Sequence, residues 1–489
     1  MLEHSILYGV AYHHAGLTLE ERECIEGGFR KNVITVLVAT STLAAGVNLP
    51  ARRVLFRTPR VGRNFLSPTK YRQMAGRAGR KGIDLYGESI VICRDDAEAQ
   101  FVRDHLIDSP LEPITSQLIP PRNGGDGEEP SSTNLQRFIL EGFGTNSVRS
   151  NCDLVRFLDL SLQRTEIEPA EWHRECQRAL NWLIRSEFLK RSEPTEVEPA
   201  AAETEQDGDG HVYFEGTLEI TPLGFATIGS GLDPKQSLLV FEEIARTRRR
   251  GVHLANSLHL CYLLSPIRNN GGNVEPKWDR YYDIFMALSG AKREIAATAG
   301  ISEQTLSEYA HNPSKRPPYR STAKLHVKYK RFYSAVILNK VIEEAPISKI
   351  VATFNIEGGQ LQSLQSSSAS FASSISVFCI KLNWNCMAQI IAHFAQRLNF
   401  GVSSELLPLM KMSNVKAFRA RTLFDCGLTT IEDIVNASLE TIVLALSSRA
   451  SFSGNDLQKR LLMNHAQKIK YEADTIYNRM MTLQQQEED

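Results

Sequence analysis

The chain lacks an excess of charge of either sign. Its 489 residues include 56 Lys and Arg and 56 Asp and Glu, so the formal net charge at pH 7 is zero. Domains that bind nucleic acids are often basic overall, and this balance gives such a function no support. Any nucleic-acid site must therefore come from local clusters of basic side chains.

The chain also lacks metal-binding cysteine patterns and long apolar runs. The eight cysteines are never spaced as Cys-x-x-Cys, so we expect no metal site and the reduced thiols of an intracellular protein. No apolar run reaches membrane length, and no signal peptide is evident. This predicts no membrane partner and a nuclear or cytosolic location.

A third absence concerns phosphate binding. No G-x-x-x-x-G-K-[ST] motif occurs, and no Asp-Glu pair follows an expected strand. These two elements hold the phosphates of ATP and its Mg²⁺ in P-loop ATPases. We therefore expect this chain alone to be without ATPase activity.

The first hundred residues alternate between strand-like and helix-like segments. Residues 33–40 are a short apolar run rich in β-branched residues, which predicts a strand buried on both faces. Residues 53–56 and 88–93 are typical of two further strands. The alternation predicts a doubly wound α/β lobe.

Hydroxyl-bearing and small residues follow the first of these strands. Thr40, Ser41 and Thr42 lie at its expected carboxyl end, and Gly46 and Asn48 come shortly afterwards. A loop at the carboxyl end of a buried parallel strand can admit a ligand or a nucleic-acid backbone.

The most informative segment is Gln-Met-Ala-Gly-Arg-Ala-Gly-Arg at residues 73–80. Ser67 and Pro68 are a typical helix start, so the segment is expected on or just after a helix. Arg77 and Arg80 are three residues apart and would reach one phosphate-sized target from a single helical turn. A guanidinium stays charged and bonds oxyanions in pairs, which suits an arginine finger on the γ-phosphate of ATP. The alternative is a solvated basic turn.

Four segments carry a resemblance to a known family. In order, AYHHAG, ATSTLAAGVNLPARRV, YRQMAGRAGRKG and GES closely resemble the second RecA-like lobe of superfamily 2 helicases, most nearly the HELQ-type helicases and the helicase domain of DNA polymerase theta. The ordered set is far more specific than any one motif. The resemblance implies an ATP-dependent 3′→5′ DNA helicase acting in repair in the nucleus. Its implied partners are single-stranded or forked DNA, with repair proteins as further candidates.

The resemblance also implies a nucleotide site. Arg77 and Arg80 would contact the γ-phosphate, while Gly46, Asn48 and Gln73 would approach the nucleotide. ATP and Mg²⁺ would be held mainly by a first lobe that this sequence does not contain. We therefore interpret the chain as a C-terminal portion of a helicase, a truncated isoform or a truncated gene model.

DNA contacts are implied in the same lobe. Thr40, Ser41 and Thr42 would hold the DNA backbone. The segment around Arg60 and Arg63 matches the family's strand-separating hairpin, and the alternative is an ordinary surface loop.

The resemblance extends over nearly the whole chain and predicts four regions. The fold class is an α/β RecA-like lobe, incomplete at its start, at 1–108, followed by mainly helical regions. These are a winged-helix-like domain at 109–235, a helical ratchet-like domain at 236–400, and a helix-hairpin-helix-like region with a C-terminal helix at 401–489. The acidic stretch 192–211 is expected to be a disordered loop that enlarges the wing. A generic small helical domain is the alternative to the winged helix.

A helix rich in Ser, Gln and Ala is expected after Gly358-Gly359. Its small polar face suits a groove for single-stranded DNA and resembles the family's ratchet helix. Gln362, Gln365 and Phe371 are candidate DNA contacts, with core packing as the alternative for Phe371.

Basic and aromatic residues also alternate between positions 315 and 333. Such a stretch can bind phosphates and stack bases. A solvated helix face is the alternative.

The sequence around Gly427 resembles a helix-hairpin-helix, with one helix ending near this glycine and another following it. This motif offers backbone amides to a DNA phosphate. Ser-Asn-Val at 413–415 stands where Gly-x-Gly is expected, which hinders a close backbone approach. Arg419 and Arg421 are candidate compensating contacts, and a purely structural hairpin is the alternative.

Two other functions stay open. The chain is alternatively a non-enzymatic isoform that binds DNA or a partner, or a relative of RNA helicases. The lack of a polymerase region after the hairpin favours a HELQ-type protein, whereas Gly-Gln-Leu-Gln-Ser-Leu-Gln at 359–365 looks more like polymerase theta.

Overall fold

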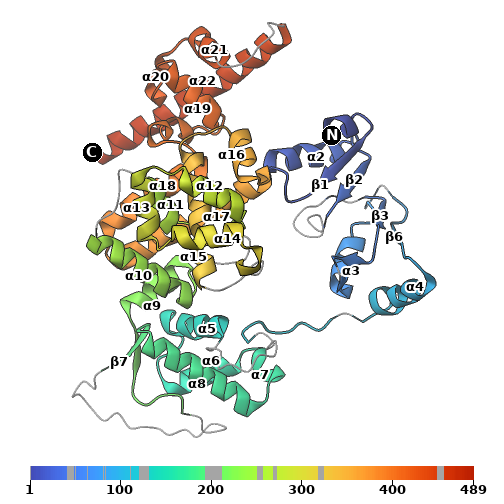
Figure 1. The fold of residues 1–489 in the computed structure, drawn as a ribbon, viewed down its shortest axis with the longest axis vertical. Coiled ribbons are helices and arrows are strands. Elements are labelled where there is room, and N and C mark those ends of the chain that lie inside the picture. Colours follow the sequence, from blue (N-terminus) through green and yellow to red (C-terminus); the bar gives the residue numbers. More distant parts are fainter. Residues whose placement is uncertain are drawn as a thin grey trace. The chain divides into compact units, whose positions relative to one another are not determined.

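The computed structural model describes residues 2–40, 49, 51–62, 64–80, 82, 84–110, 112–119, 132–192, 212–250, 257–267, 273–317, 324–448 and 456–488. The chain forms two compact units (Figure 1). The first comprises Met1–Asn123 with Ser161–Glu168 and Glu357–Gln362, and the second comprises Gly124–Leu160, Pro169–Ile356 and Ser363–Asp489.

The first unit mixes short strands and helices, as the alternating sequence pattern predicts. Its elements are α1 (Leu2–Ile6), β1 (Val10–His13), α2 (Leu19–Arg30), β2 (Val36–Ala39), β3 (Arg53–Phe56), β4 (Arg60–Val61), β5 (Asn64–Phe65), α3 (Pro68–Ala75), β6 (Glu88–Val91), α4 (Asp96–Val102) and α7 (Gln163–Glu166).

The longer strands of this unit pair in parallel. Val10 lies opposite Val36 in the β1–β2 pair, and Arg53 lies opposite Glu88 in the β3–β6 pair. Parallel strands need a crossover connection. Along the chain, α2 connects β1 to β2, and α3 lies in the connection from β3 to β6. Among the described residues these are two separate two-stranded sheets, so parallel α/β pairing is confirmed while one continuous doubly wound sheet is not shown.

The expectation that strand 33–40 is buried on both faces is wrong. Val36 and Val38 of β2 are 52% and 50% exposed. Within the described part of the chain, β2 pairs only with β1. The β1–β2 pair packs against a small core formed by Ala11, Ile25 and Ile34.

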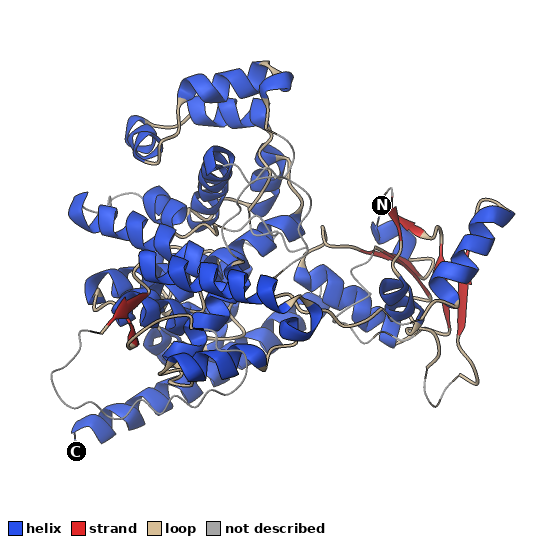
Figure 2. Ribbon diagram, turned by 90° about the horizontal axis from the view of Figure 1, so that it is seen from below, coloured by secondary structure: helices blue, strands red, loops and turns tan. Residues whose placement is uncertain are grey.

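The second unit is mainly helical, and its strands form a small hairpin (Figure 2). Its first elements are α5 (Thr133–Gly144), α6 (Asn151–Asp159), α8 (Pro169–Arg185), β7 (Leu189–Arg191), β8 (Leu218–Ile220) and α9 (Pro222–Ser230). Strands β7 and β8 pair antiparallel, with Leu189 opposite Ile220. Most of the acidic stretch expected between them, residues 193–211, lies outside the described residues.

The remaining elements that the structure describes in the second unit are helices. They are α10 (Pro234–Arg250), α11 (Ser257–Leu263), α12 (Trp278–Met286), α13 (Gly290–Thr298), α14 (Glu303–His311), α15 (Lys324–Ile342), α16 (Ile347–Phe354), α17 (Gly358–Lys381), α18 (Asn385–Phe400), α19 (Ala417–Asp425), α20 (Ile431–Asn436), α21 (Leu439–Ser447) and α22 (Asp456–Glu488). The first turn of α17 belongs to the first unit.

The described aromatic residues of the basic stretch on α15 do not form a surface for nucleic acid. Tyr329, Phe332 and Tyr333 are at most 1% exposed, so they cannot stack on bases. Lys330 and Arg331 are also buried, which rules out the solvated face for these two residues. Lys330 pairs with Glu275 at 2.7 Å, and Arg331 pairs with Glu243 at 2.8 Å, because a buried charge requires a partner.

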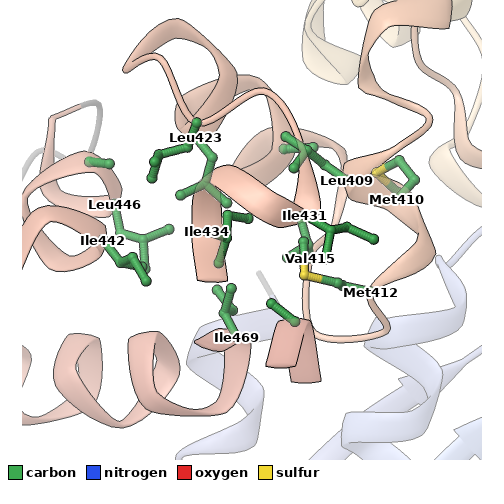
Figure 3. Close-up of a cluster of buried hydrophobic side chains, with 14 of the residues drawn as sticks. Leu409, Met410, Met412, Val415, Leu423, Ile431, Ile434, Ile442, Leu446 and Ile469 are labelled. Carbon is green, nitrogen blue, oxygen red and sulfur yellow. The ribbon is translucent and has the colours of Figure 1, made fainter. Parts of the chain in front are cut away.

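The C-terminal helices share a core of their own (Figure 3). Leu423 of α19, Ile434 of α20, Ile442 of α21 and Ile469 of α22 are fully buried together. Gly427, just after α19, has φ +87°, which confirms the predicted glycine helix end. The second helix, α20, follows it as expected.

Candidate nucleotide and nucleic-acid sites

The double-arginine segment lies at the end of α3. This helix ends at Ala75, so Gln73 is helical and exposed, whereas Arg77 and Arg80 lie beyond the helix. The expected position on or just after a helix is confirmed. The expectation that both arginines share one helical turn is wrong, because Gly79, with φ +91°, turns the backbone away from helical geometry.

The arginine turn is fixed by backbone contacts. The Ala51 N–H donates to the Arg77 carbonyl at 2.9 Å, and the Gly79 N–H donates to the Ala51 carbonyl at 2.7 Å. A Cβ at Gly87 would lie 2.5 Å from the Ala78 carbonyl, so only glycine fits beside the turn. These contacts hold the arginines at a defined place next to β3 and β6.

Arg80 holds a carboxylate of its own chain. Its Nε lies 2.9 Å from Asp84 Oδ2, its Nη2 lies 3.1 Å from Oδ1, and its backbone N–H also donates to Oδ2 at 2.9 Å. The hydrogen bond from Arg80 lowers the pKa of the Asp84 carboxyl against the opposing effect of burial. The guanidinium fork is therefore already set to bind a planar oxyanion in two places. The sequence analysis missed Asp84, although its i,i+4 spacing from Arg80 is a recognisable signal.

The expected DNA loop is described only at its first residue. Thr40 directly follows β2, is exposed, and donates its backbone N–H to the His13 carbonyl at 3.2 Å. The other candidates of this loop, Ser41, Thr42, Gly46 and Asn48, lie outside the described residues.

The predicted strand-separating segment forms a β-hairpin. Strands β4 and β5 pair antiparallel through Arg60 and Phe65, and Gly62 turns between them with φ +65°. Arg60 Nε lies 3.1 Å from Glu98 Oε1, and its guanidinium lies 3.7 Å above the Phe65 ring. Arg63 lies outside the described residues. The hairpin is confirmed as a structural element, and strand separation stays a prediction.

Helix α17 has two different faces. Leu361, Leu364, Ala372 and Ile375 are buried. The opposite face exposes small hydroxyl residues, namely Ser363, Ser366, Ser370 and Ser373. Further along the helix, the same face exposes Val377 and Ile380.

The three DNA candidates on α17 are all half-buried. Gln362 is the fifth residue of α17 and donates from Nε2 to Glu20 Oε2 at 2.8 Å. Gln365 donates from Nε2 to the Asn399 carbonyl at 3.1 Å. Phe371 is absent from the fully buried core. Their DNA contacts stay predictions.

The two arginine candidates of the C-terminal hairpin have protein partners. Arg419 donates from Nη1 to the Asn414 carbonyl at 3.0 Å. Arg421 bonds both carboxylate oxygens of Glu344, and it also contacts Glu405 at 2.6 Å. Arg421 would have to break these ion pairs to bind a phosphate, so DNA contact by Arg421 stays a prediction.

No metal site and no membrane span stand out in the described part of the chain. There, no three His, Cys, Asp or Glu side chains group so as to hold a metal ion. None of the helices within the described ranges combines the length and the apolar character needed to cross a bilayer.

Three family profiles match successive parts of the chain. Residues 1–82 match a helicase conserved C-terminal domain, residues 87–190 match a helix-turn-helix domain, and residues 234–398 match the helical domain of the DNA polymerase theta helicase-like region. Together with the parallel strand pairs and the mainly helical second unit, they define a helicase C-terminal domain followed by helix-turn-helix and helical domains.

Individual relatives agree with these profiles. The chain is 32% identical to mouse DNA polymerase theta over 92% of this chain and 17% of the relative. It is 30% identical to human Helicase POLQ-like over 97% of this chain and 41% of the relative. It is 27% identical to the ATP-dependent DNA helicase Hel308 of Caldivirga maquilingensis over 96% of this chain and 57% of the relative.

The chain is similar to the helicase regions of DNA polymerase theta, Helicase POLQ-like and Hel308, so the expected resemblance to this family of helicases is confirmed. It spans less than two thirds of the length of these relatives. The similarity extends to both the polymerase theta and the Helicase POLQ-like proteins and does not separate them.

Proposed function

We propose that this chain supplies the second RecA-like lobe and the DNA-holding domains of an ATP-dependent 3′→5′ DNA helicase that moves along single-stranded DNA in nuclear DNA repair. The observation that carries the proposal is the fixed arginine turn. Arg80 presents a two-pronged guanidinium on a turn held by Ala51 and Gly87. Its own partner Asp84 is a planar oxyanion.

The donors present fit a nucleotide phosphate. Arg77 and Arg80 would stabilise the negative charge on the γ-phosphate, and Gln73, exposed at the end of α3, would approach the nucleotide. When bound, ATP and Mg²⁺ supply the phosphoryl-transfer chemistry, in which positioning and charge stabilisation provide almost all of the catalysis.

The remaining regions would hold DNA. The β4–β5 hairpin would separate strands, and the small polar face of α17 would follow the single strand. The β7–β8 hairpin, whose first strand begins at the end of the helix-turn-helix match, would be the wing of a winged helix. Closure of the two lobes of the whole helicase on ATP would move the strand by one step.

The nucleotide role is tested by joining a relative's first lobe to this chain and replacing Arg80 by Ala. We expect the DNA-stimulated ATPase rate to fall by about 10³-fold, as for other arginine fingers, with little change in DNA affinity. Arg94→Ala is the matched control, because Arg94 is an exposed arginine of the same unit. Equal turnover in both variants would refute the arginine finger.

The choice of nucleic acid needs a separate test. The names of two of these relatives, DNA polymerase theta and the ATP-dependent DNA helicase Hel308, favour DNA over RNA. Competition between DNA and RNA oligonucleotides of one sequence should show tighter DNA binding, and preference for RNA would favour the RNA-helicase alternative. Binding of DNA without any ATPase activity in the joined protein would favour a non-enzymatic module.

A further inference from the structure

A carboxylate of the chain occupies the short turn at Ser413 and Asn414, just before α19, which is called the Ser413–Asn414 hairpin below. Ser413 donates to Glu472 Oε1 from its backbone N at 2.6 Å and from its hydroxyl at 2.7 Å. Asn414 donates to Oε2 from its backbone N at 3.1 Å and from Nδ2 at 2.7 Å. Both oxygens of Glu472 thus receive two donors each, although Glu472 lies on α22, far away in sequence.

Four convergent donors, two of them successive backbone amides, are an arrangement that binds anions. Glu472 satisfies it with the same chemistry that a phosphate oxygen pair would use. Burial raises the pKa of the Glu472 carboxyl, but the bonds from Ser413 and Asn414 outweigh this effect and lower the pKa below its ordinary value. The carboxylate is therefore ionised at neutral pH and competes with any external anion.

The surroundings of this carboxylate are basic. His465 and Lys468 lie on the same helix, α22. Burial and the nearby charges of Arg419 and Lys468 lower the pKa of the His465 imidazole, so both cations lie near this side chain. Arg419 itself donates to the Asn414 carbonyl at 3.0 Å. Without Glu472, the hairpin would present backbone amides beside Arg419 and Lys468, which is a favourable site for a phosphate.

Glu472 can leave the hairpin without moving α22. The helix is anchored by the fully buried Ala466, Ile469 and Ala473, whereas Glu472 is half-buried and Ser413 is exposed. Rotation of one side chain would uncover the donors to solvent.

We propose that Glu472 is an internal substitute for a nucleic-acid phosphate and closes the Ser413–Asn414 hairpin against DNA until its side chain swings away. This autoinhibitory contact rests on the proposed DNA-binding function. It explains how a hairpin without the usual glycines keeps its amides directed at an anion.

The test compares the whole chain with two variants, Glu472→Gln and Asp474→Asn, using a fluorescent single-stranded oligonucleotide at low salt. Each variant loses one negative charge from α22, but only Glu472 bonds the hairpin. We expect Glu472→Gln to tighten binding at least fivefold more than Asp474→Asn does. One added phosphate contact should also steepen the dependence of log affinity on log salt by about 0.7.

Two further results decide the outcome. Ser413→Gly removes one hydroxyl donor to Glu472 while keeping the amide, so it should tighten binding to a smaller extent even where Glu472→Gln impairs folding. Equal affinities of the Glu472 and Asp474 variants would refute this inference but would leave the proposed DNA binding intact. Failure of all proteins to bind DNA would contradict both the inference and DNA binding, while the Arg80 test of ATP hydrolysis would be unaffected.

Discussion

Arg421 of α19 and Glu344, in the turn that follows α15, form a two-pronged ion pair. Arg421 Nε lies 2.7 Å from Glu344 Oε2, and Nη2 lies 2.8 Å from Oε1. Glu344 has φ +57°, in the left-handed region that costs a non-glycine residue about 1 kcal/mol. Ser403 also donates its backbone N–H to Glu344 at 3.0 Å. The pair therefore fastens the C-terminal helices to the helical domain.

Replacing Glu344 by Gln should destabilise the second unit. The change leaves the Arg421 guanidinium without its main carboxylate, and we expect the free energy of unfolding to fall by about 2 kcal/mol. Denaturant unfolding monitored by circular dichroism measures the loss. Glu242→Gln is the control, since Glu242 is exposed in the middle of α10. Equal losses in both variants would show that the ion pair contributes nothing specific.

The same pair predicts a dependence on pH. Burial raises the pKa of the Glu344 carboxyl, but the bonds from Arg421 and Ser403 prevail and lower the pKa from 4.5 to about 2. A group whose pKa is lower in the folded state stabilises the fold above its unfolded pKa, and this contribution is lost as the pH falls toward the folded pKa. The stability difference between the wild type and Glu344→Gln should therefore be constant above pH 4.5 and shrink toward pH 2. A difference that does not change over this range would contradict the assignment.

Asp84 is predicted to position Arg80. In the joined two-lobe protein, Asp84→Asn should lower the ATPase kcat about tenfold, less than Arg80→Ala does, because the guanidinium remains but its orientation is less fixed. The KM for ATP distinguishes positioning of Arg80 from competition for it. If Asp84 only competed with the ATP phosphate for Arg80, it would raise the KM of the wild type, and Asp84→Asn would lower it. A lower KM with unchanged kcat in Asp84→Asn would contradict positioning.

Two phenylalanines of α17 should behave differently when each is replaced by Ala. Phe371 is half-buried, and its loss should weaken single-stranded DNA binding by about 1–3 kcal/mol if it stacks on a base. Phe378 is 0% exposed, and its loss should cost about 3–5 kcal/mol of stability. Fluorescence anisotropy and thermal unfolding measure the two effects. A Phe371 variant that loses stability but keeps its DNA affinity would establish the core-packing alternative.

The sequence predicted the local elements well where short-range patterns determine them. Ser67 caps α3, whose second turn contains Gln73, and Gly427 follows α19 with a positive φ, as their positions indicate. These features depend on neighbours within a few residues, so the sequence contains the necessary information.

The sequence misled where burial depends on distant neighbours. Lys330 and Arg331 read as charges for solvent or phosphate, yet both are buried against Glu275 and Glu243. The expected shared helical turn of Arg77 and Arg80 failed because Gly79 changes the backbone direction between them.

By itself, the sequence determined the family resemblance, the order of the elements and the position of the arginine turn, because ordered motifs and capping residues act locally. Only the tertiary structure decided which oxyanions the basic groups hold. Asp84 on Arg80, Glu344 on Arg421 and Glu472 on the hairpin amides are paired by the path of the chain. Two of these partners lie 58 or more residues away from the group they bind, a separation at which no periodic pattern links one residue to another.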